Sequence, residues 1–302
     1  MALDSLPPPS HAPGELLDGR YRVDEVIGRG GHGVVYRALD ETTKTEVAIK
    51  FLHPEFANQP EYNVRMLREA QACAKLVGTA AIQIHALRSD QNGALFIVME
   101  LLDGMDLNDY LAQWEDKAHF FPIESIPAIF EPIVHTLDQA HRMGIVHRDL
   151  KAGNIYVMSP KHGGGVRLLD FGLAKMMSAK PLTREGMVAG SPSYIAPEVW
   201  KGDPRKLDHR IDVYSIAALI FRVLAARPPF SGTLLELMQS SLTATRPSLH
   251  ALRPDLPEAV DPWVKKALAI APEERFQSVS EMWTALRAVL PMGAAVTASK
   301  SG

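Results

Sequence analysis

The glycine-rich stretch Gly28-Arg-Gly-Gly-His-Gly33 constrains the fold of this chain more than any other segment. Before it, residues 21–27 alternate between apolar and polar side chains, and after it come Val34, Val35 and Tyr36. Both flanks therefore have the pattern of β-strands. A dinucleotide-binding fold would need a helix directly after the glycines. The β-branched and aromatic residues found there instead favour a hairpin with a glycine-rich tip.

Such a tip would let main-chain amides come close to the phosphates of a nucleotide. Gly28, Gly30 and Gly33 have no Cβ atom to obstruct that approach. An ordinary glycine-rich turn has the same composition, and this spacing alone does not separate the two interpretations. The stretch is therefore a candidate binding site that needs support from the rest of the chain.

A second candidate site is the segment His147-Arg-Asp-Leu-Lys-Ala-Gly-Asn154. Asp149 could accept the proton of an attacking hydroxyl, Lys151 could neutralise charge on a moving phosphoryl group, and Asn154 could offer its side-chain oxygen to Mg²⁺. A short charged run is usually a solvated loop. These three groups together are nevertheless what phosphoryl transfer to an alcohol requires.

Asp170, in Leu168-Leu-Asp-Phe-Gly172, argues against the solvated loop. Residues 155–157 and 166–169 look like two short strands, and a hairpin between them would bring Asn154 and Asp170 to the same end. Oxygen ligands of this kind, few in number and completed by phosphate oxygens, suit one or two divalent ions.

Lys50 ends the strand-like run Glu46-Val-Ala-Ile-Lys50. It could simply point to water, because burying an ammonium without a partner is costly. A helical pattern between residues 62 and 77, however, carries Glu69. We expect Glu69 to pair with Lys50 and to orient it toward phosphates.

The remaining patterns suggest two lobes, the usual outcome for a chain of 302 residues. Strand-like runs at 82–87 and 94–99 complete a predicted five-stranded sheet with one helix. After the last strand, Met99-Glu-Leu-Leu102 forms a connector to the next part of the chain. Its free main-chain amides and carbonyls could hydrogen-bond to the edge of an adenine ring. Later periodicity is helical. Pro132 lies inside the apolar stripe 126–137 and predicts a kink or a late helix start. Further helices are predicted at 208–225, 233–240, 257–270 and 278–290.

We therefore expect an α+β chain with a disordered proline-rich leader (1–18), a small β-rich lobe (19–102), a larger helical lobe (103–290) and a flexible tail (291–302). The formal net charge of −3 provides no basic field for nucleic acid. A single cysteine, Cys73, excludes an internal disulfide, and we find neither a secretory signal nor a membrane span. These features predict a cytoplasmic location.

Six elements between Tyr21 and about Leu290 resemble the protein kinase superfamily in order and spacing. They are Gly28-x-Gly30-x-x-Gly33-x-Val35, Val47-Ala-Ile-Lys50, Glu69, His147-Arg-Asp-Leu-Lys-Ala-Gly-Asn154, Asp170-Phe-Gly172 and Ala196-Pro-Glu198. Lys151 and the segment 190–198 are similar to those of serine/threonine kinases. The nearest likeness is to bacterial kinases of eukaryotic (Hanks) type, which implies a two-lobed kinase fold.

The resemblance implies a site for ATP with Mg²⁺, or Mn²⁺ as an alternative. Asp149 would be the catalytic base, assisted by Lys151, Lys50 and Glu69, while Asn154 and Asp170 would hold the metal. It also implies an ion pair between Glu198 and Arg275, and Asp212 as an anchor for the catalytic loop. Nucleotide contacts would come from Ile27, Gly28, Gly30, Gly33, Val35, Ala48, Lys50, Met99, Glu100, Leu102 and Tyr156.

Two departures from the family pattern affect this expectation. Ala152-Gly153 stands where a proline and an acidic or small residue are usual, which loosens the loop backbone but removes no catalytic group. Tyr156 stands where a smaller aliphatic residue usually packs beneath the adenine ring. Nucleotide binding could be tightened or distorted there.

Arg148 directly precedes the expected base, where a basic residue commonly responds to a phosphate. We hypothesise that Thr183, or Ser178 as second choice, is autophosphorylated and pairs with Arg148, ordering residues 173–193. Ser191 keeps a hydroxyl where threonine is commoner.

The predicted function is phosphate transfer from ATP to serine or threonine hydroxyls of protein substrates. A nucleotide-binding pseudokinase scaffold is the alternative, although Lys50, Asp149 and Asp170 are all present. A kinase of small molecules is disfavoured by the intact Ala196-Pro-Glu198. A homodimer through the back of the small lobe is open, since no residue pattern establishes it.

Overall fold

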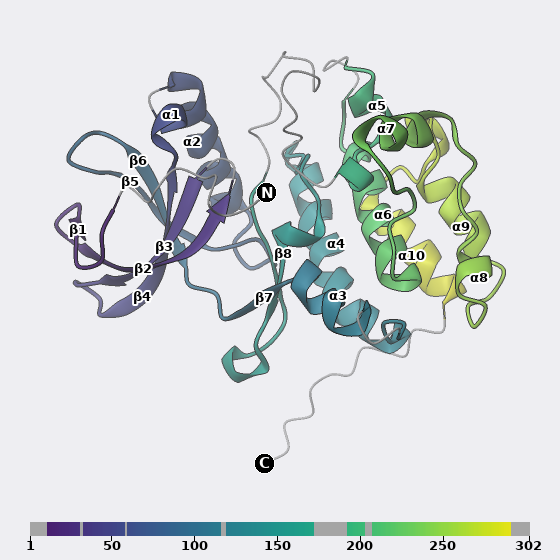
Figure 1. The fold of residues 1–302 in the computed structure, drawn as a ribbon, viewed down its shortest axis with the longest axis horizontal. Coiled ribbons are helices and arrows are strands. Elements are labelled where there is room, and N and C mark those ends of the chain that lie inside the picture. The colour runs from purple at the N-terminus through teal and green to yellow at the C-terminus, as the bar shows by residue number, and fades with distance from the viewer. Residues whose placement is uncertain are drawn as a thin grey trace. The chain divides into compact units, whose positions relative to one another are not determined.

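The computed structural model describes residues 11–30, 33–57, 59–115, 119–171, 192–202 and 207–290. The chain divides into two compact units, Met1–Asp103 and Gly104–Gly302. The first unit is rich in strands and the second is mostly helical (Figure 1), as expected for an α+β kinase-like chain. The predicted division, after Leu102, differs from the observed one by a single residue.

The first unit contains an antiparallel sheet with the strand order β1-β2-β3-β4-β6-β5. Six strands replace the five that were predicted, because β1 has only two residues and leaves no readable pattern. The strands are β1 (Leu16–Leu17), β2 (Tyr21–Gly30), β3 (Gly33–Asp40), β4 (Thr45–Leu52), β5 (Ile84–Ser89) and β6 (Leu95–Glu100).

The prediction that residues 1–18 are disordered is wrong for residues 11–18. Leu16 and Leu17 pair with β2, and the Gly14 amide donates to the Val23 carbonyl at 2.8 Å. The His11 ring packs 4.3 Å from the ring of Phe51. Contacts of this kind order the segment despite Pro13. Residues 1–10 and the predicted tail 291–302 lie outside the described residues.

Aromatic and aliphatic side chains fill the core of the first unit. Phe51 stacks on Phe96 with ring centroids 4.9 Å apart, and Tyr36 and Ile49 are fully buried. Two helices follow β4, the short α1 (Pro54–Ala57) and the longer α2 (Pro60–Lys75), and α2 contacts β5 and β6. The observed α2 begins and ends two residues before the predicted helix. It begins at Pro60, because an N–H in the first turn of a helix has no carbonyl partner within the helix and proline therefore loses no hydrogen bond there.

The second unit begins with a three-stranded antiparallel sheet of order β7-β8-β9. Its strands are β7 (Gly104–Asp106), β8 (Ile155–Met158) and β9 (Val166–Leu168). The helices are α3 (Leu107–Glu115), α4 (Ile126–Arg142), α5 (Pro197–Trp200), α6 (Arg210–Ala225), α7 (Leu234–Thr243), α8 (Leu249–Leu252), α9 (Val260–Ala267) and α10 (Val279–Val289).

The helix α6 is the centre of this unit and contacts α8, α9 and α10 (Figure 1). Of its 16 residues, 13 are buried, and these lie on every side of the helix. A helix that is apolar on every side must be enclosed by protein or by lipid. In the described part of the chain, every helix is too short or too polar to cross a bilayer. The helix predicted at 208–225 is confirmed and proves to be buried.

Pro132 lies inside α4, which runs without a break from Ile126 to Arg142. The predicted late helix start is therefore wrong. Buried residues precede the proline (Ile129, Phe130) and follow it (Ile133, Val134). Their burial against α10 and β9 offsets the ~3 kcal/mol that a proline costs within a helix.

Candidate active site

The glycine-rich hairpin is present as predicted, with Gly30 paired to Gly33 and Gly28 paired to Val35. Its glycines differ in what they permit. A Cβ atom on Gly33 would collide with the carbonyl oxygen of Phe51, whereas one on Gly30 would meet nothing within 4 Å. Gly33 is therefore required by the packing of β3 on β4, a reason that the sequence did not reveal. Residues 31–32 lie outside the described residues.

Lys50 forms the predicted pair with Glu69, with Nζ and Oε1 3.1 Å apart. The two side chains are 16% and 18% exposed, so neither points freely to water. The alternative of a solvent-facing lysine at a strand end is excluded. Strand β4 supplies the lysine and α2 supplies the carboxylate, and both belong to the first unit.

Several predicted nucleotide contacts share one face of the first sheet. Val35 is opposite Lys50, and Ala48 is opposite Met99. Directly opposite residues of antiparallel strands project to the same face, and Ala48 and Lys50 are two residues apart on one strand. Register therefore places Val35, Ala48, Lys50 and Met99 together.

Glu100 differs from the other predicted contacts. Its amide donates to the Gln83 carbonyl at 2.9 Å, and its Oε1 accepts the Gln83 amide at 2.7 Å. The expectation that the connector has free main-chain groups is wrong for this amide. Leu102 follows β6 at the end of the first unit, and Tyr156 lies on β8 of the second. Ile27 is exposed on β2.

The segment 147–154 brings its predicted catalytic residues within hydrogen-bonding distance of one another. Lys151 Nζ lies 3.0 Å from Asp149 Oδ2. Asn154 Nδ2 donates to the Asp149 carbonyl at 2.8 Å and to Asp149 Oδ2 at 3.2 Å. A short 3₁₀ turn, Ala152–Asn154, returns the chain toward the base. Since the amide nitrogen of Asn154 faces Asp149, its oxygen is directed elsewhere.

Asp212 anchors this segment, as predicted. Its carboxylate accepts the amides of His147 and Arg148 and the His141 Nε2–H, each at 2.8 Å. Burial raises the pKa of Asp212, but the hydrogen bond from His141 and the nearby imidazoles outweigh it, so the pKa lies below its ordinary value. The anchor is thus a charged carboxylate held by three donors. The contribution of His141 was missed from the sequence.

His147 joins the catalytic segment to the segment that carries Asp170. Its Nε2 donates to the Leu169 carbonyl at 3.0 Å, and its ring lies 4.8 Å from that of Phe171. Burial lowers the pKa of His147. The Leu169 amide donates to the Asn154 carbonyl at 2.8 Å. The prediction that Asn154 and Asp170 lie at one end of the β8–β9 hairpin is confirmed.

Two of these residues adopt left-handed backbone conformations, Arg148 with φ 66° and Asp170 with φ 48°. Such conformations cost non-glycine residues on the order of 1 kcal/mol and concentrate at functional sites. Sequence patterns cannot show them. Among the described residues, Arg148 Nε and Nη1 are buried without a hydrogen-bond partner, and burial lowers the pKa of this guanidinium.

The predicted Glu198–Arg275 ion pair is present and buried. Two nearly parallel bonds of 2.7 and 2.6 Å join the guanidinium to the carboxylate, whose side chains are 0% and 8% exposed. Arg275 also donates to the Ala269 carbonyl at 2.7 Å and to the Ile270 carbonyl at 3.1 Å. These bonds hold the Ala196-Pro-Glu198 segment against the helical core.

Asn154 and Asp170 suit a divalent cation completed by phosphate oxygens. In the parts of the chain that the structure describes, no cluster of three or more His, Cys, Asp or Glu side chains could hold a metal. Mg²⁺, however, is commonly bound through one or two side chains, with water and phosphate completing its shell. The orientation of Asn154, nitrogen toward Asp149, agrees with a ligand role for its oxygen.

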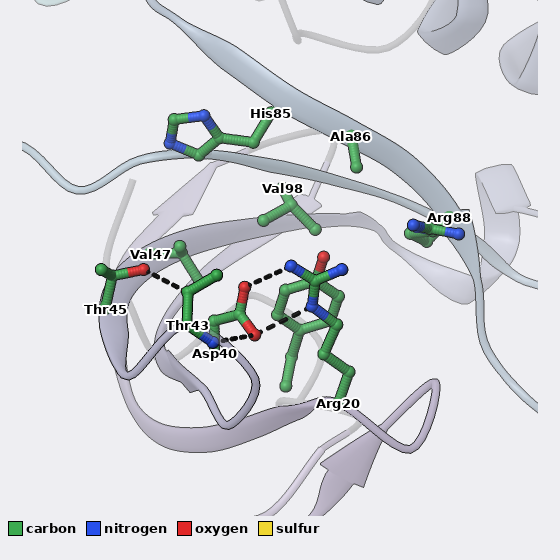
Figure 2. A pocket seen from close by; sticks show the side chains of 10 residues that line it. Arg20, Asp40, Thr43, Thr45, Val47, His85, Ala86, Arg88 and Val98 are labelled. Atoms are coloured by element: carbon green, nitrogen blue, oxygen red, sulfur yellow. Dashed lines mark hydrogen bonds and ion pairs between the residues drawn. The ribbon is translucent and has the colours of Figure 1, made fainter.

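A cavity of about 310 Å³ in the first unit is separate from the predicted nucleotide contacts (Figure 2). It is bordered by Arg20, which donates to Asp40 at 2.8 and 2.7 Å and holds the pKa of that carboxyl well below its usual range. Asp40 ends β3, whereas Gly33 begins it. Asp40, at the border of the cavity, therefore lies about 23 Å along the strand from the glycine-rich tip.

Some predicted site residues lie outside the described residues. These are Gly172 and the candidate phosphorylation sites Ser178, Thr183 and Ser191.

Comparison with known families identifies the chain. The family described as "Protein kinase domain" matches residues 21–284. The chain belongs to the protein kinase family. The expected resemblance to bacterial kinases of eukaryotic type is confirmed by the relatives below.

Curated relatives are bacterial serine/threonine-protein kinases. The chain is 33% identical to PrkC of Bacillus subtilis over 89% of its own length and 40% of that protein. It is 33% identical to PknA of Corynebacterium glutamicum over 91% of its length and 57% of that protein. It is 32% identical to PknL of Mycobacterium tuberculosis over 91% of its length and 66% of that protein. The chain thus spans about two fifths to two thirds of these relatives.

Solved kinase structures have the same fold. The kinase domain of Mycobacterium tuberculosis PknI aligns with a TM-score of 0.72 at 29% identity, covering 93% of this chain and 100% of that one. The apo form of PpkA-294 aligns with a TM-score of 0.75 at 23% identity, covering 92% and 100%, and supports the fold alone. The predicted two-lobed kinase fold is confirmed.

Proposed function

We propose that this chain is a protein serine/threonine kinase that transfers the γ-phosphoryl group of ATP to hydroxyls of protein substrates. The observation that carries the proposal is the cluster of Asp149, Lys151 and Asn154, joined by bonds of 2.8 to 3.2 Å. Asp212 accepts the His147 amide just before this cluster, and the His147 ring in turn bonds to the Leu169 carbonyl.

Asp149 is the base. It accepts the proton of the substrate hydroxyl while the oxygen bonds to the γ-phosphorus and the bond to ADP breaks. Lys151, 3.0 Å from Asp149, neutralises negative charge on the phosphoryl group during transfer.

The first unit supplies the nucleotide contacts. Val35, Ala48 and Met99 form an apolar patch on the sheet face that also carries Lys50, which suits an adenine ring. Ile27 and Leu102 extend the apolar contacts of this unit, and Gly28, Gly30 and Gly33 let amides approach the phosphates. Tyr156 is a further proposed contact that belongs to the second unit. Lys50, oriented by Glu69, binds the α- and β-phosphates.

Asn154 and Asp170 hold the divalent ion that accompanies the nucleotide. Mg²⁺ is the ion we propose, with Mn²⁺ as the alternative, because both accept hard oxygen ligands. When bound, the ion neutralises charge on the phosphates. His147 maintains the spacing of the two ligands through its bond to the Leu169 carbonyl.

Arg148 is the candidate sensor of activation. A buried guanidinium whose Nε and Nη1 lack a partner among the described residues suits a phosphate. We propose phosphorylated Thr183 as that partner, with Ser178 and then Ser191 as the other candidates. Mass spectrometry of active protein should find phosphate between residues 173 and 193, and its loss in Thr183→Ala should lower activity. Active protein without phosphate there would contradict this part.

The main test compares the wild type with Asp149→Asn. Phosphate transfer from ATP and Mg²⁺ to a generic protein substrate should fall roughly 10²–10⁴-fold, the contribution of a positioned base. Asp109→Asn, an exposed position on α3, is the matched control and should leave the rate unchanged. Wild-type protein that binds ATP but transfers no phosphate would support the pseudokinase scaffold instead.

A further inference from the structure

A buried histidine at the end of β4 contacts the glycine-rich hairpin. His53 is 2% exposed, and its Nε2 lies 2.8 Å from the carbonyl oxygen of Gly30. A carbonyl oxygen only accepts, so Nε2 must carry a proton and donate it. The bond joins the residue that follows β4 to the residue at which β2 ends.

His53 reaches Gly30 across the end of an intervening strand. Gly33, the first residue of β3, is paired with Gly30 on one side and with Leu52 on the other. His53 follows Leu52 directly. Because Gly33 has no Cβ, β3 lies close against the β4 backbone there. Gly30 is therefore held by its hydrogen bonds to β3 and, independently, by an imidazole from the residue that follows β4.

The main chain of His53 connects the same point to α2. Its carbonyl accepts the amides of Phe56 at 2.8 Å and Ala57 at 2.9 Å, and these two hydrogen bonds form the start of α1. The Ala57 carbonyl in turn accepts Asn63 Nδ2 at 3.2 Å, joining α1 to α2. Figure 1 shows α1 and α2 beside each other, and the two helices are in contact.

The same set of contacts leads to Lys50. The helix α2 carries Glu69, whose carboxylate lies 3.1 Å from Lys50 Nζ, and Lys50 lies three residues before His53 on β4. One residue thus holds the glycine-rich tip with its side chain and the start of α1 with its main chain. Bonded contacts thus connect the tip to the group that orients Lys50.

We propose that His53 is a positioning residue for nucleotide binding, which clamps the glycine-rich hairpin at Gly30 and sets its distance from Lys50. The proposal rests on the proposed kinase function, because that function requires the hairpin amides and the lysine to meet one triphosphate. His53 itself touches no reacting atom. Its contribution is the hydrogen bond, so a side chain that restores the donor should restore the function.

Two substitutions separate the hydrogen bond from the space that the ring fills. In glutamine, the amide nitrogen is the same number of bonds from Cα as Nε2 of histidine, so His53→Gln can donate to Gly30. In His53→Asn the donor is one bond nearer the main chain and falls short. His85→Asn, an exposed position on the edge strand β5 that borders the cavity shown in Figure 2, is the matched control.

Hydrogen–deuterium exchange of the amides of residues 28–35, without nucleotide, measures the clamp itself. The Kd of a fluorescent ATP analogue and the KM values for ATP and protein substrate measure its effect. In His53→Asn we expect faster exchange and a rise of roughly tenfold in Kd and in KM for ATP, equivalent to one hydrogen bond of ~1.4 kcal/mol. The KM for protein substrate should stay the same, and His53→Gln and His85→Asn should match the wild type.

The proposal is overturned if His53→Asn leaves the exchange and the ATP affinity unchanged. It is equally overturned if His53→Gln fails in the same way as His53→Asn, because the ring would then act only by filling space. Wild-type protein that neither binds the analogue nor transfers phosphate would contradict the proposed function instead. The exchange experiment would still decide whether the clamp exists, since it requires no nucleotide.

Discussion

Each unit contains an ion pair that the proposed chemistry depends on, and the two pairs are built differently. Lys50 and Glu69 join across 3.1 Å with side chains 16% and 18% exposed. Arg275 and Glu198 form two bonds of 2.7 and 2.6 Å with side chains 0% and 8% exposed, and the carbonyls of Ala269, Ile270 and Arg210 also accept from the guanidinium.

Physical chemistry gives these pairs opposite properties. A partly hydrated pair gains little from its Coulomb attraction, so it can open without much loss of stability. A pair removed from water leaves an uncompensated charge when it is broken. The ion pair of Lys50 can therefore adjust its geometry at little cost, whereas the pair that holds the Ala196-Pro-Glu198 segment cannot.

The largest expected effect on stability comes from Glu198→Ala, which leaves the buried Arg275 without its counter-charge. The free energy of unfolding of the second unit should fall by about 3–5 kcal/mol. All four tryptophans lie at positions 114, 200, 263 and 283, so urea unfolding followed by their fluorescence reports on the second unit. The matched control Glu131→Ala, in a pair that is 35% and 44% exposed, should lower it by under ~1 kcal/mol. Similar losses of unfolding free energy in Glu198→Ala and Glu131→Ala would contradict the distinction between buried and exposed ion pairs.

Asp212→Ala should be the next most destabilising change. It leaves the amides of His147 and Arg148 and the His141 ring without their acceptor. We expect a loss of about 3 kcal/mol by the same fluorescence measurement, together with loss of phosphate transfer. The control is Asp255→Ala, whose side chain is 57% exposed beside Arg253 and should matter by under ~1 kcal/mol. An Asp212→Ala protein of wild-type stability would mean that the loop does not depend on its anchor.

Acidification should weaken the second unit through His147. Burial lowers the pKa of this imidazole in the folded protein, so the unfolded chain binds a proton more readily. The stability is fully present above the ordinary pKa of about 6.5 and is lost as pH falls below it, by up to ~1.4 kcal/mol per pH unit. Unfolding of His147→Gln, which keeps a donor for Leu169, should depend less on pH between about 7.5 and 5.5. An unchanged dependence would assign the acid sensitivity to other groups.

The smallest effect on stability is expected for Glu69→Gln in the first unit. Its unfolding free energy, measured by hydrogen exchange, should change by under ~1 kcal/mol. Phosphate transfer should nevertheless fall on the order of 10²-fold, because Lys50 loses its orientation. Glu61→Gln on the same helix, where the carboxylate is 52% exposed, should alter neither quantity. A large loss of stability in Glu69→Gln would show that both units hold their ion pairs rigidly.

Much of the candidate site could be predicted from the sequence, because its signals are local or chemically specific. Strand-forming residues after the glycines identified a hairpin, and an ammonium in an apolar strand required a carboxylate partner, which Glu69 supplies. The pairing of Glu198 with Arg275 and the anchoring role of Asp212 came from resemblance, and both are present.

Tertiary structure alone decided the features that depend on residues distant in sequence. His53 meets Gly30 from 23 residues away and His147 meets Leu169 from 22, while Pro132 continues a helix because buried neighbours stabilise both of its halves. The left-handed backbones of Arg148 and Asp170 are likewise imposed by surrounding bonds. Local patterns determine which elements form, since propensity and periodicity act within a few residues. Which side chain completes a contact depends on packing between elements, and that is settled only when the chain is folded.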